Sequence, residues 1–375
     1  MNSQNDLGET KLNEQPQGEK RTEKFTPRNK GTKKRKFKKI LFWVFGSIVS
    51  FFVIIAIVAA SFYYSGKFSL LNTDGMKVDP SGAVSDVEIE QDGKTVIYSG
   101  KKYVYNENIT TILCMGVDQE NFSDIDGVKG QNGQADGVFL YAIDTATGES
   151  TIIPISRDTM VDVDLYSAAG TYVSSKKQQL CLAYAYGDGK HTSCENTVKS
   201  VQRLFYGLPI NSYVAIDLKA VEVLSKKVGG VPVTPTETIK YGQYTFYKGK
   251  KVVLTGEKAR VFVQARDGSK LDSNLNRMQH QKQFITAFFS KALSKTKEDI
   301  TFPVSVYKST SKYMVTDITA PEISFLATAV LKSGGSLKYK SIDGDIKKGE
   351  KHAEFYANDE SVYKTVIDVF YKPAD

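Results

Sequence analysis

The chain has 375 residues, of which 50 are lysine or arginine and 42 are aspartate or glutamate, giving a formal net charge of +8. Residues 1–39 alone hold 12 basic and 5 acidic side chains, so the rest of the chain is close to neutral. These residues lack the apolar periodicity of a folded reading module, so no nucleic-acid partner is expected and a DNA-binding tail is the weaker alternative. A basic tail of this kind favours contact with anionic membrane lipid.

Residues 40–64 contain no charged side chain and no proline. An apolar helix needs about 20 residues to cross roughly 30 Å of hydrocarbon, so this segment is long enough to span a bilayer. Six lysines and arginines lie within residues 33–39, whereas only Lys67 follows closely, and the positive-inside rule then keeps the N-terminus in the cytoplasm. We expect a single-pass protein of the cell membrane, with a disordered cytoplasmic tail at 1–39, a transmembrane helix at 40–64 and an extracellular C-terminal region. A cleaved signal peptide is the alternative, but its apolar region is usually only about 7 to 15 residues long.

Residues 65–107 are rich in Gly, Ser, Asp and Lys and predict an extracellular stalk. Within this segment, Lys94–Tyr98 and Lys102–Tyr105 alternate apolar and polar side chains on either side of Gly100, which is typical of a small β-hairpin. Denser patterns begin after it, so the extracellular folded domain is expected at 108–375.

The folded region alternates strand and helix patterns in chain order. Short apolar runs predict strands at Ile109–Val117, Gly137–Ile143 and Ser150–Ile155. Helical periods follow at Gln178–Tyr186, at Glu195–Tyr206 with Ser193 as N-cap, and at Leu218–Val228. Further strands are expected at Tyr213–Ile216, Gly230–Val233 and Thr301–Val306, and further helices at Asn274–Ser294 and Glu322–Leu331. Such alternation predicts the α/β class, here a three-layer α/β/α sandwich around a mixed central sheet, preceded by one transmembrane helix.

Two aspartates mark the ends of neighbouring strand patterns: Asp118 closes one and Asp136 opens the next. Open α/β sheets place their ligands at strand ends, and Mg²⁺ typically takes one or two carboxylates from a protein. Two ordinary turn aspartates are the alternative. The three histidines lie far apart in the sequence, which disfavours a zinc site.

Arginine is rare beyond residue 64, where it occurs only at Arg157, Arg203, Arg260, Arg266 and Arg277. A guanidinium group is preferred where phosphate must be held by two parallel hydrogen bonds. Arg157 follows a strand pattern, and Arg277 lies at the start of the long helix with Gln281 on the same face, opposite the apolar stripe. These positions predict an anion site, whereas Arg203 and Arg260 are interpreted as solvated helix positions.

Six ordered motifs resemble the LytR-CpsA-Psr family, over roughly residues 109–293. They are Cys114–Asp118, Gln134–Val138, Pro154–Thr159, Leu182–Gly187, Gly229–Val231, and the pair Phe262–Arg266 with Asn276–Gln281. Gln134, Gln264 and His280 depart from the family pattern, because arginine is expected at these positions. The positive charge available to an anion is therefore reduced.

The resemblance implies a phosphotransferase of Gram-positive cell envelopes. Such an enzyme moves a glycopolymer, such as teichoic acid, capsule or another secondary polysaccharide, from a polyprenyl-pyrophosphate carrier to peptidoglycan. The implied partners are the lipid-linked donor, the peptidoglycan acceptor and membrane lipid, with an apolar groove for the lipid chain.

The resemblance also implies roles for individual residues. Asp118 and Asp136 would bind Mg²⁺ or Mn²⁺, and pyrophosphate would be bound by Arg157, Gln264, Arg266, Arg277 and Gln281. The implied catalytic residues are Asp118, Asp136, Arg157 and Asp158, and one of the three carboxylates would take the proton of the acceptor hydroxyl. Two other functions stay open: a non-catalytic module that binds glycan or lipid phosphate, and an envelope regulator that acts through its tail.

The three cysteines suggest one further feature. Cys181 and Cys194 flank a loop between two expected helices, so an extracellular disulfide between them would clamp that loop. Two buried thiols are the alternative. Cys114 is expected to pack within a strand as a small hydrophobic residue.

Overall fold

The computed structural model describes residues 50, 53–54, 56–58, 60–71, 77–80, 82–119, 122, 133–167, 169–267, 270–350 and 352–374. The chain divides into two compact units, residues 1–57 and 58–375, and the strands of the described residues all lie in the second. The expected tail at 1–39 and much of the expected transmembrane helix at 40–64 lie outside the described residues. Within the described ranges, helices long and apolar enough to cross a membrane are absent.

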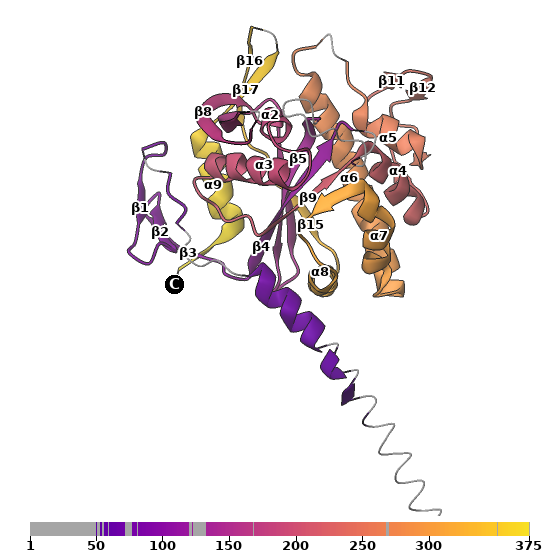
Figure 1. The fold of residues 1–375 in the computed structure, drawn as a ribbon, viewed down its shortest axis with the longest axis horizontal. Coiled ribbons are helices and arrows are strands. Elements are labelled where there is room, and N and C mark those ends of the chain that lie inside the picture. Colours follow the sequence, from indigo (N-terminus) through magenta and orange to yellow (C-terminus); the bar gives the residue numbers. More distant parts are fainter. Residues whose placement is uncertain are drawn as a thin grey trace, which may run out of the picture. The chain divides into compact units, whose positions relative to one another are not determined.

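A six-stranded mixed sheet forms the centre of the second unit, with strand order β14-β9-β4-β5-β6-β15 (Figure 1). Its strands are β4 (Ile109–Val117), β5 (Ala135–Asp144), β6 (Ser150–Ile155), β9 (Ser212–Ile216), β14 (Met314–Thr316) and β15 (Leu337–Tyr339). β5 runs antiparallel to β4 and β6, whereas β9 is parallel to β4 and β15 is parallel to β6. β4 is an almost continuous apolar run because both of its faces are covered. The predicted α/β class with a mixed sheet is confirmed.

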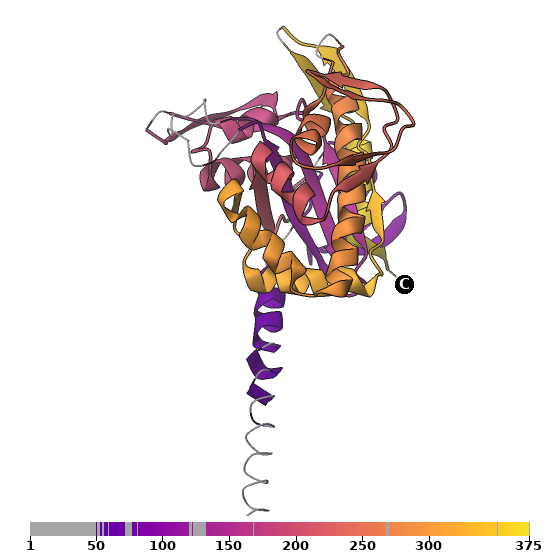
Figure 2. The same cartoon turned by 90° about the vertical axis from the view of Figure 1, so that its right-hand side faces the viewer.

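Helices cover both faces of this sheet. One face packs against α2 (Cys181–Ala185), α3 (His191–Leu204) and α9 (Asp359–Phe370), in a core that includes Leu113, Leu140 and Ile153. The other face lies under α6 (Ser273–Glu298), α7 (Phe302–Thr310) and α8 (Ala320–Lys332), and α6 runs along the sheet (Figure 2). Beside α6, a smaller core around Phe262 joins α4 (Leu218–Lys227) and α5 (Glu257–Gln264).

Two-stranded sheets surround this centre. They pair β7 (Met160–Tyr166) with β8 (Tyr172–Gln179), β10 (Val231–Val233) with β13 (Val252–Leu254), β11 (Ile239–Tyr241) with β12 (Tyr244–Phe246), and β16 (Gly344–Lys348) with β17 (Ala353–Ala357). A 3-10 helix, η2 (Ser311–Tyr313), leads from α7 into β14. β17 reaches the turn after β6, where Phe355 N donates to the backbone oxygen of Asp158 at 2.8 Å.

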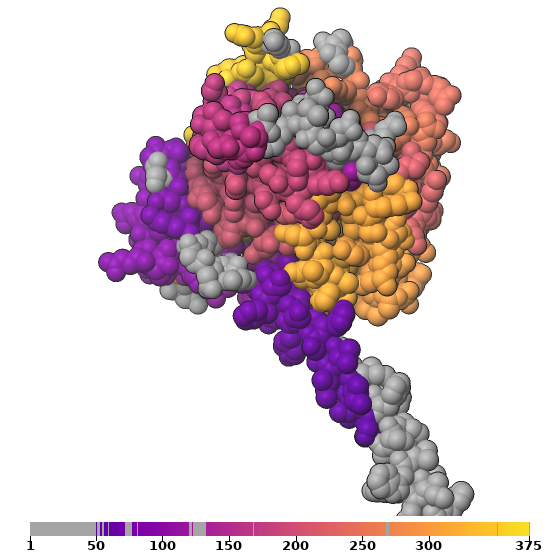
Figure 3. Space-filling model, viewed as in Figure 1, coloured from indigo at the N-terminus to yellow at the C-terminus, as the bar shows by residue number. Residues whose placement is uncertain are grey.

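The segment expected to form a stalk is part of the folded unit. β1 (Val87–Ile89), β2 (Thr95–Tyr98) and β3 (Lys101–Tyr105) form a four-stranded sheet with β18 (Tyr371–Pro373). The hairpin predicted within this segment is confirmed, with Gly100 at φ +71°, a conformation that favours glycine. In Figure 3 the side chains of β1–β3 form a continuous surface with the rest of the unit, in agreement with the packing of Val87 and Ile89 on the main core.

Two predicted helix starts differ from the structure. Gln178 and Gln179 end strand β8, so the helix expected from Gln178 begins only at Cys181. The N-cap of α3 is Lys190, so Ser193 lies inside the helix. The Ser193 hydroxyl accepts a hydrogen bond from Gly189 N, in the loop before the helix, at 2.7 Å.

The strand predicted at Thr301–Val306 is wrong, because this segment forms most of α7. Its β-branched residues favour a strand locally, but Pro303 lies in the first turn of a helix, where its missing N–H has no partner to lose. Packing of α7 against α4 and α8 then decides the outcome.

Candidate active site

Strand and helix ends meet at one edge of the central sheet. Asp118 follows β4, Asp136 lies at the start of β5, and Arg157 lies in the turn after β6. The antiparallel pairing of β5 with both of its neighbours brings these three positions together. Arg277 reaches the same edge from the second turn of α6.

Asp136 is the centre of this cluster. Its carboxylate forms ion pairs with Arg157 Nη1 and, at 2.5 Å, with Arg277 Nη1. Arg277 Nη2 also donates to the backbone oxygen of Asp136 at 3.0 Å. Burial, aided by the nearby charge of Arg157, lowers the pKa of Arg277 to about 10, so the group stays positive at neutral pH. Two guanidinium groups share the carboxylate of Asp136, and Arg157 also lies 3.7 Å from Asp158, so the guanidinium N–H groups rather than a net charge would suit an anionic ligand.

Arg157 connects Asp136 to Asp118. Its Nη2 donates to Gln134 Oε1 and, at 3.0 Å, to Cys181 Sγ. Gln134 N donates in turn to Asp118 Oδ1 at 2.5 Å. Asp118 is exposed at the margin of the cluster, so the two aspartates of the predicted pair are linked through Gln134 and Arg157.

Asn274 is a member of the cluster that the sequence did not single out. Its Oδ1 accepts hydrogen bonds from Arg266 Nη1 at 3.0 Å and from Arg277 Nη2 at 3.2 Å. Its Nδ2 donates to Asp158 Oδ2. The side chain is buried and aligns both arginines. Its position one helical turn before Arg277 is the signal that could have identified it.

Asp158 is buried beside the cluster, and amide donors occupy both of its carboxylate oxygens. Gln179 Nε2 donates to Oδ1 at 2.9 Å, and Asn274 donates to Oδ2. Arg157 Nε lies 3.7 Å from Oδ1. The carboxylate therefore anchors Asn274 and the end of β8, and neither oxygen is left without a donor.

The two glutamines predicted to bind pyrophosphate lie in different surroundings. Gln281 packs against Gly137, where an added Cβ would lie 3.2 Å from its Nε2, and so it adjoins Asp136. Gln264 Oε1 instead accepts a hydrogen bond from Arg260 Nη1 at 3.1 Å. Gln281 thus lies beside the cluster, with its Nε2 donating to the backbone oxygen of Val263 at 3.4 Å, whereas Gln264 is turned toward Arg260.

His280 is buried next to the site. One ring nitrogen lies 2.9 Å from Glu237 Oε1 and the other lies 3.2 Å from the backbone oxygen of Ala265. These contacts tie α6 to the segment before β11 and to the end of α5. The two arginines interpreted as helix positions both bind carboxylates, Arg203 that of Asp164 and Arg260 that of Glu222.

An apolar cavity of about 540 Å³ lies between the sheet and α6, α7 and α8. Side chains lining it include Phe139, Tyr141, Val214, Phe284, Phe288 and Leu326. Gly137 and Gln281 line it as well, so the cavity opens beside Asp136. Cys114 also borders it, and burial raises the pKa of its thiol to about 12, which keeps the group neutral as expected for a small hydrophobic residue.

The expectation that Arg277 and Gln281 share a face of the long helix opposite its apolar stripe is wrong. Arg277 is only 5% exposed, and its face of α6 continues through Gln281 into Phe284 and Phe288. The reason is that the sheet lies under this face over its whole length. The polar side chains that lie at the sheet edge, Asn274, Arg277 and Gln281, come from its first three turns.

The disulfide predicted between Cys181 and Cys194 is also wrong, because both are free thiols. Both are fully buried, Cys181 at the start of α2 against Arg157 and Cys194 on the face of α3 that packs in the main core. Burial raises the pKa of each thiol, although the charge of Arg157 acts in the opposite direction on Cys181. Within the described part of the chain, no group of three or more His, Cys, Asp or Glu side chains gathers into a metal site.

Comparisons with known proteins agree on one family. A model of the LytR_cpsA_psr family matches residues 75–367. The polyisoprenyl-teichoic acid–peptidoglycan teichoic acid transferase TagU of Enterococcus faecalis (strain ATCC 700802 / V583) is 24% identical over 333 residues, covering 88% of this chain and 93% of that protein. TagU of Oceanobacillus iheyensis, which carries the same description, is 25% identical over 324 residues, covering 85% and 89%.

Solved structures share the fold. The crystal structure of B. subtilis TagV is 23% identical and superposes with a TM-score of 0.53, covering 70% of this chain and 96% of that one. A structure described as TagT bound to LI-WTA is 19% identical, with a TM-score of 0.52 and coverage of 70% and 89%.

Proposed function

The chain belongs to the LytR_cpsA_psr family, and from that premise we propose that it transfers a glycopolymer from a polyprenyl-pyrophosphate carrier to peptidoglycan through a phosphodiester bond. Its TagU relatives are named as transferases of polyisoprenyl-linked teichoic acid to peptidoglycan. Teichoic acid is therefore the polymer that we propose for this chain.

One face of α6 supports this proposal most directly, because it changes from cationic to apolar along the helix. Arg277 and Gln281 adjoin Asp136 at the sheet edge, and Phe284 and Phe288 follow along the apolar cavity. A polyprenyl pyrophosphate has the same order of polarity, with a charged head and an apolar tail. The lipid would enter the cavity of about 540 Å³, where each buried methylene group contributes about 0.8 kcal/mol.

The pyrophosphate would lie at the cluster. Arg157 and Arg277 would exchange part of their contact with Asp136 for phosphate oxygens, with Arg266 and Gln281 at the sides. Asn274 would keep Arg266 and Arg277 aligned during that exchange. Gln264 would have to leave Arg260 in order to join them.

Asp118 and Asp136 are the residues that we propose to hold Mg²⁺ or Mn²⁺. The donors fit a hard cation, because both side chains offer carboxylate oxygens. The next residue in the chain, Gln119, has a buried Oε1 with no hydrogen-bond partner among the described residues. When bound, the cation would neutralise charge on the phosphate oxygens.

The chemistry asks the protein mainly for positioning and charge neutralisation. The acceptor hydroxyl oxygen forms a bond to the phosphorus that carries the glycan, and the bond from that phosphorus to the bridging oxygen breaks, releasing polyprenyl phosphate. The hydroxyl proton needs an acceptor. We assign it to Asp118, whose exposed carboxylate accepts one hydrogen bond, from Gln134 N, whereas amide donors occupy both oxygens of Asp158.

Residues 40–64 complete the proposal as a membrane anchor. An anchor of that kind would hold the catalytic unit on the outer surface of the cell membrane, where a lipid-linked donor is confined. Confinement raises the effective concentration of the donor at the cluster.

The test uses the full-length protein in detergent with Mg²⁺, a polyprenyl-pyrophosphate-linked teichoic acid precursor and peptidoglycan. Transfer of polymer is expected, and Asp118→Ala and Arg157→Ala should each slow it by about 100-fold or more. Arg203→Ala is the matched control, because this arginine binds Asp164 away from the cluster. Donor binding without turnover would contradict an enzyme and favour a binding module. Loss of function on deletion of residues 1–30, with the anchor kept, would favour a regulator.

A further inference from the structure

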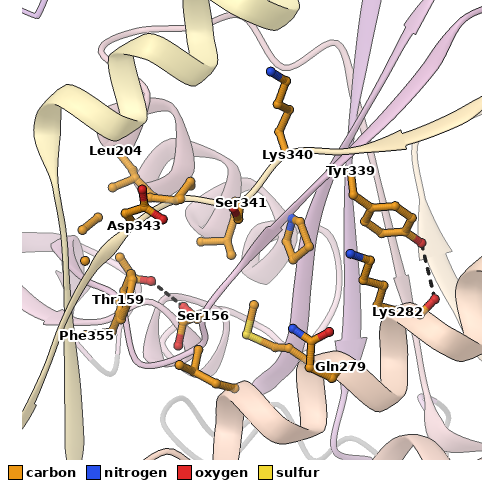
Figure 4. Close-up of a pocket in the computed structure, with 17 residues that line it drawn as sticks. Ser156, Thr159, Leu204, Gln279, Lys282, Tyr339, Lys340, Ser341, Asp343 and Phe355 are labelled. Atoms are coloured by element: carbon orange, nitrogen blue, oxygen red, sulfur yellow. Dashed lines mark hydrogen bonds between the residues drawn. The ribbon is translucent and has the colours of Figure 1, made fainter. Parts of the chain in front are cut away.

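A second cavity, of about 400 Å³, borders α6 and shares no lining residue with the apolar one. Its walls are the turn after β6, the first half of α6, the segment that joins β15 to β16, and β17. Figure 4 shows Gln279 and Lys282 projecting from α6, with Ser156 and Thr159 on the turn and Ser341 on the joining segment.

This cavity shares two walls with the proposed active site. Ser156 and Thr159 line the cavity, whereas Arg157 and Asp158, which lie between them in the same turn, belong to the cluster. α6 is divided in a similar way. One side of the helix lines the cavity with Leu275, Met278, Gln279 and Lys282. The other side faces the cluster and its surroundings with Asn274, Arg277 and Gln281. A molecule in the cavity would therefore contact Ser156 and Met278, which are the sequence neighbours of the cluster arginines Arg157 and Arg277.

The lining combines an apolar floor with scattered polar groups. Apolar surface comes from Ile155, Leu275, Met278 and Phe355. The polar groups are the hydroxyls of Ser156 and Ser341, the amide of Gln279, the ammonium of Lys282 and the carboxylate of Asp343. This combination is typical of sites for small polar molecules that also present an apolar face, such as sugar rings.

The two lysines of the lining differ in what they contact. Lys282 Nζ lies 4.6 Å from the centre of the Tyr339 ring and forms no ion pair with the described residues. Lys340, in contrast, is paired with Asp368 at 2.8 Å. The ammonium of Lys282 is therefore the one available to hydroxyl or carboxylate oxygens of a ligand.

The positions of the two cavities indicate which sugar belongs here. In phosphoryl transfer the attacking and leaving oxygens lie roughly in line on opposite sides of the phosphorus. The leaving polyprenyl phosphate is assigned to the apolar cavity, which meets the cluster at Gly137 and Gln281. The second cavity is lined by Ser156 and Thr159, which flank Arg157 and Asp158 of the cluster in the same turn. We propose that this cavity binds a saccharide unit of the acceptor glycan and presents its hydroxyl to the phosphate, an inference that rests on the proposed function.

Binding of soluble, uncross-linked peptidoglycan glycan strands to the full-length protein, measured by titration calorimetry, tests the proposal without any turnover. Ser341→Trp should fill the cavity and abolish binding. Lys282→Ala removes an exposed side chain and should raise the Kd about threefold to tenfold. Lys291→Ala is the matched control, because it alters an exposed lysine on the same helix outside both cavities. A lipid-free teichoic acid fragment should not compete.

Unchanged glycan binding in both Ser341→Trp and Lys282→Ala would overturn the proposal. Displacement of the glycan strands by the teichoic acid fragment would also overturn it, because the cavity would then bind the donor. The Lys282→Ala result holds even if Ser341→Trp alters the fold. Transfer activity is a separate measurement. If glycan binding depends on the cavity but no polymer is transferred, only the proposed function is contradicted. If Ser341→Trp transfers polymer at the normal rate, only the assignment of the cavity is contradicted.

Discussion

Asp136 is the residue on which the charge balance of the cluster depends. It faces two guanidinium groups whose side chains are only 13% and 5% exposed, those of Arg157 and Arg277. Such an arrangement is stable only while the carboxylate is present, because two buried like charges repel each other at short range.

Replacing Asp136 by asparagine is therefore expected to lower the free energy of unfolding by about 3 kcal/mol, since both cations lose their buried partner. Urea denaturation at neutral pH measures this change. Asp162→Asn is the control, because its carboxylate is 55% exposed and 4.0 Å from Lys177, and it should change stability by less than about 0.5 kcal/mol. Equal stability of Asp136→Asn and the parent protein would mean that the arginines do not depend on this carboxylate.

The sequence identified the charged members of the cluster but not the amide that aligns them. Strand ends, rare arginines and family motifs predicted the charged residues Asp118, Asp136, Arg157, Arg266 and Arg277. Hydrogen bonds and ion pairs link these residues in one cluster. Asn274 carries no charge, and its role depends on three partners from different segments. Gln264 fails for the same reason, since its partner is set by the local packing of α5.

At the scale of elements, the start of α4 carries a buried charge. Asp217 follows β9 and caps the helix, with Oδ1 accepting from Ala220 N at 2.8 Å. Its Oδ2 is buried and has no hydrogen-bond partner within the described residues. Burial raises the pKa of Asp217 from 3.8 to about 6, despite the capping hydrogen bonds.

This carboxyl group holds its proton longer in the folded than in the unfolded chain, so its contribution to stability falls as pH rises from about 4 to about 6. Asp217→Asn keeps a good N-cap and removes the charge. The stability of the variant relative to the parent should therefore rise over that window and level off near pH 7. Urea denaturation at pH 4, 5.5 and 7 measures the trend, and a constant or falling difference would contradict it.

The apolar part of α6 gives a prediction about the donor. Phe288 lines the apolar cavity, so Phe288→Lys should raise the KM for donors with a long polyprenyl chain and leave short-chain donors little changed. Transfer rates with donors of two chain lengths measure the ratio. Val253→Lys, at a position that is 53% exposed on β13, is the control. Equal effects on both donors would place the lipid elsewhere.

Elements with strong local patterns were predicted well, and those decided by packing were not. β4 and β6 have the predicted ends, because each is an apolar run bounded by polar residues. β7 and β8 were missed, since β8 contains the polar run Ser174–Gln179 and lies at the surface. α7 was predicted as a strand because its local preference and its tertiary contacts disagree.

At the scale of the whole molecule, β18 joins distant parts of the chain. Tyr371 is 6% exposed, and its ring meets that of Tyr105 edge to face at 5.5 Å. Tyr371→Ala should lower the free energy of unfolding by about 3 kcal/mol, because it leaves a cavity between β3 and β18. Thermal unfolding measures the change. Lys372→Ala is the control, because it alters the next, largely exposed residue and should lower the free energy of unfolding by less than about 1 kcal/mol. An equal loss of stability in both variants would show that β18 acts through its backbone alone.

The pairing of β18 with β3 would also set an order of events during the export that we propose. If residues 40–64 remain in the membrane, β3 crosses first and its partner strand crosses only after the whole catalytic unit has followed. Until then β3 has an open edge, which is a template for pairing with another chain. If the catalytic unit is exported as proposed, a newly made molecule passes through a stage that is prone to aggregation, and slow translocation should lengthen it.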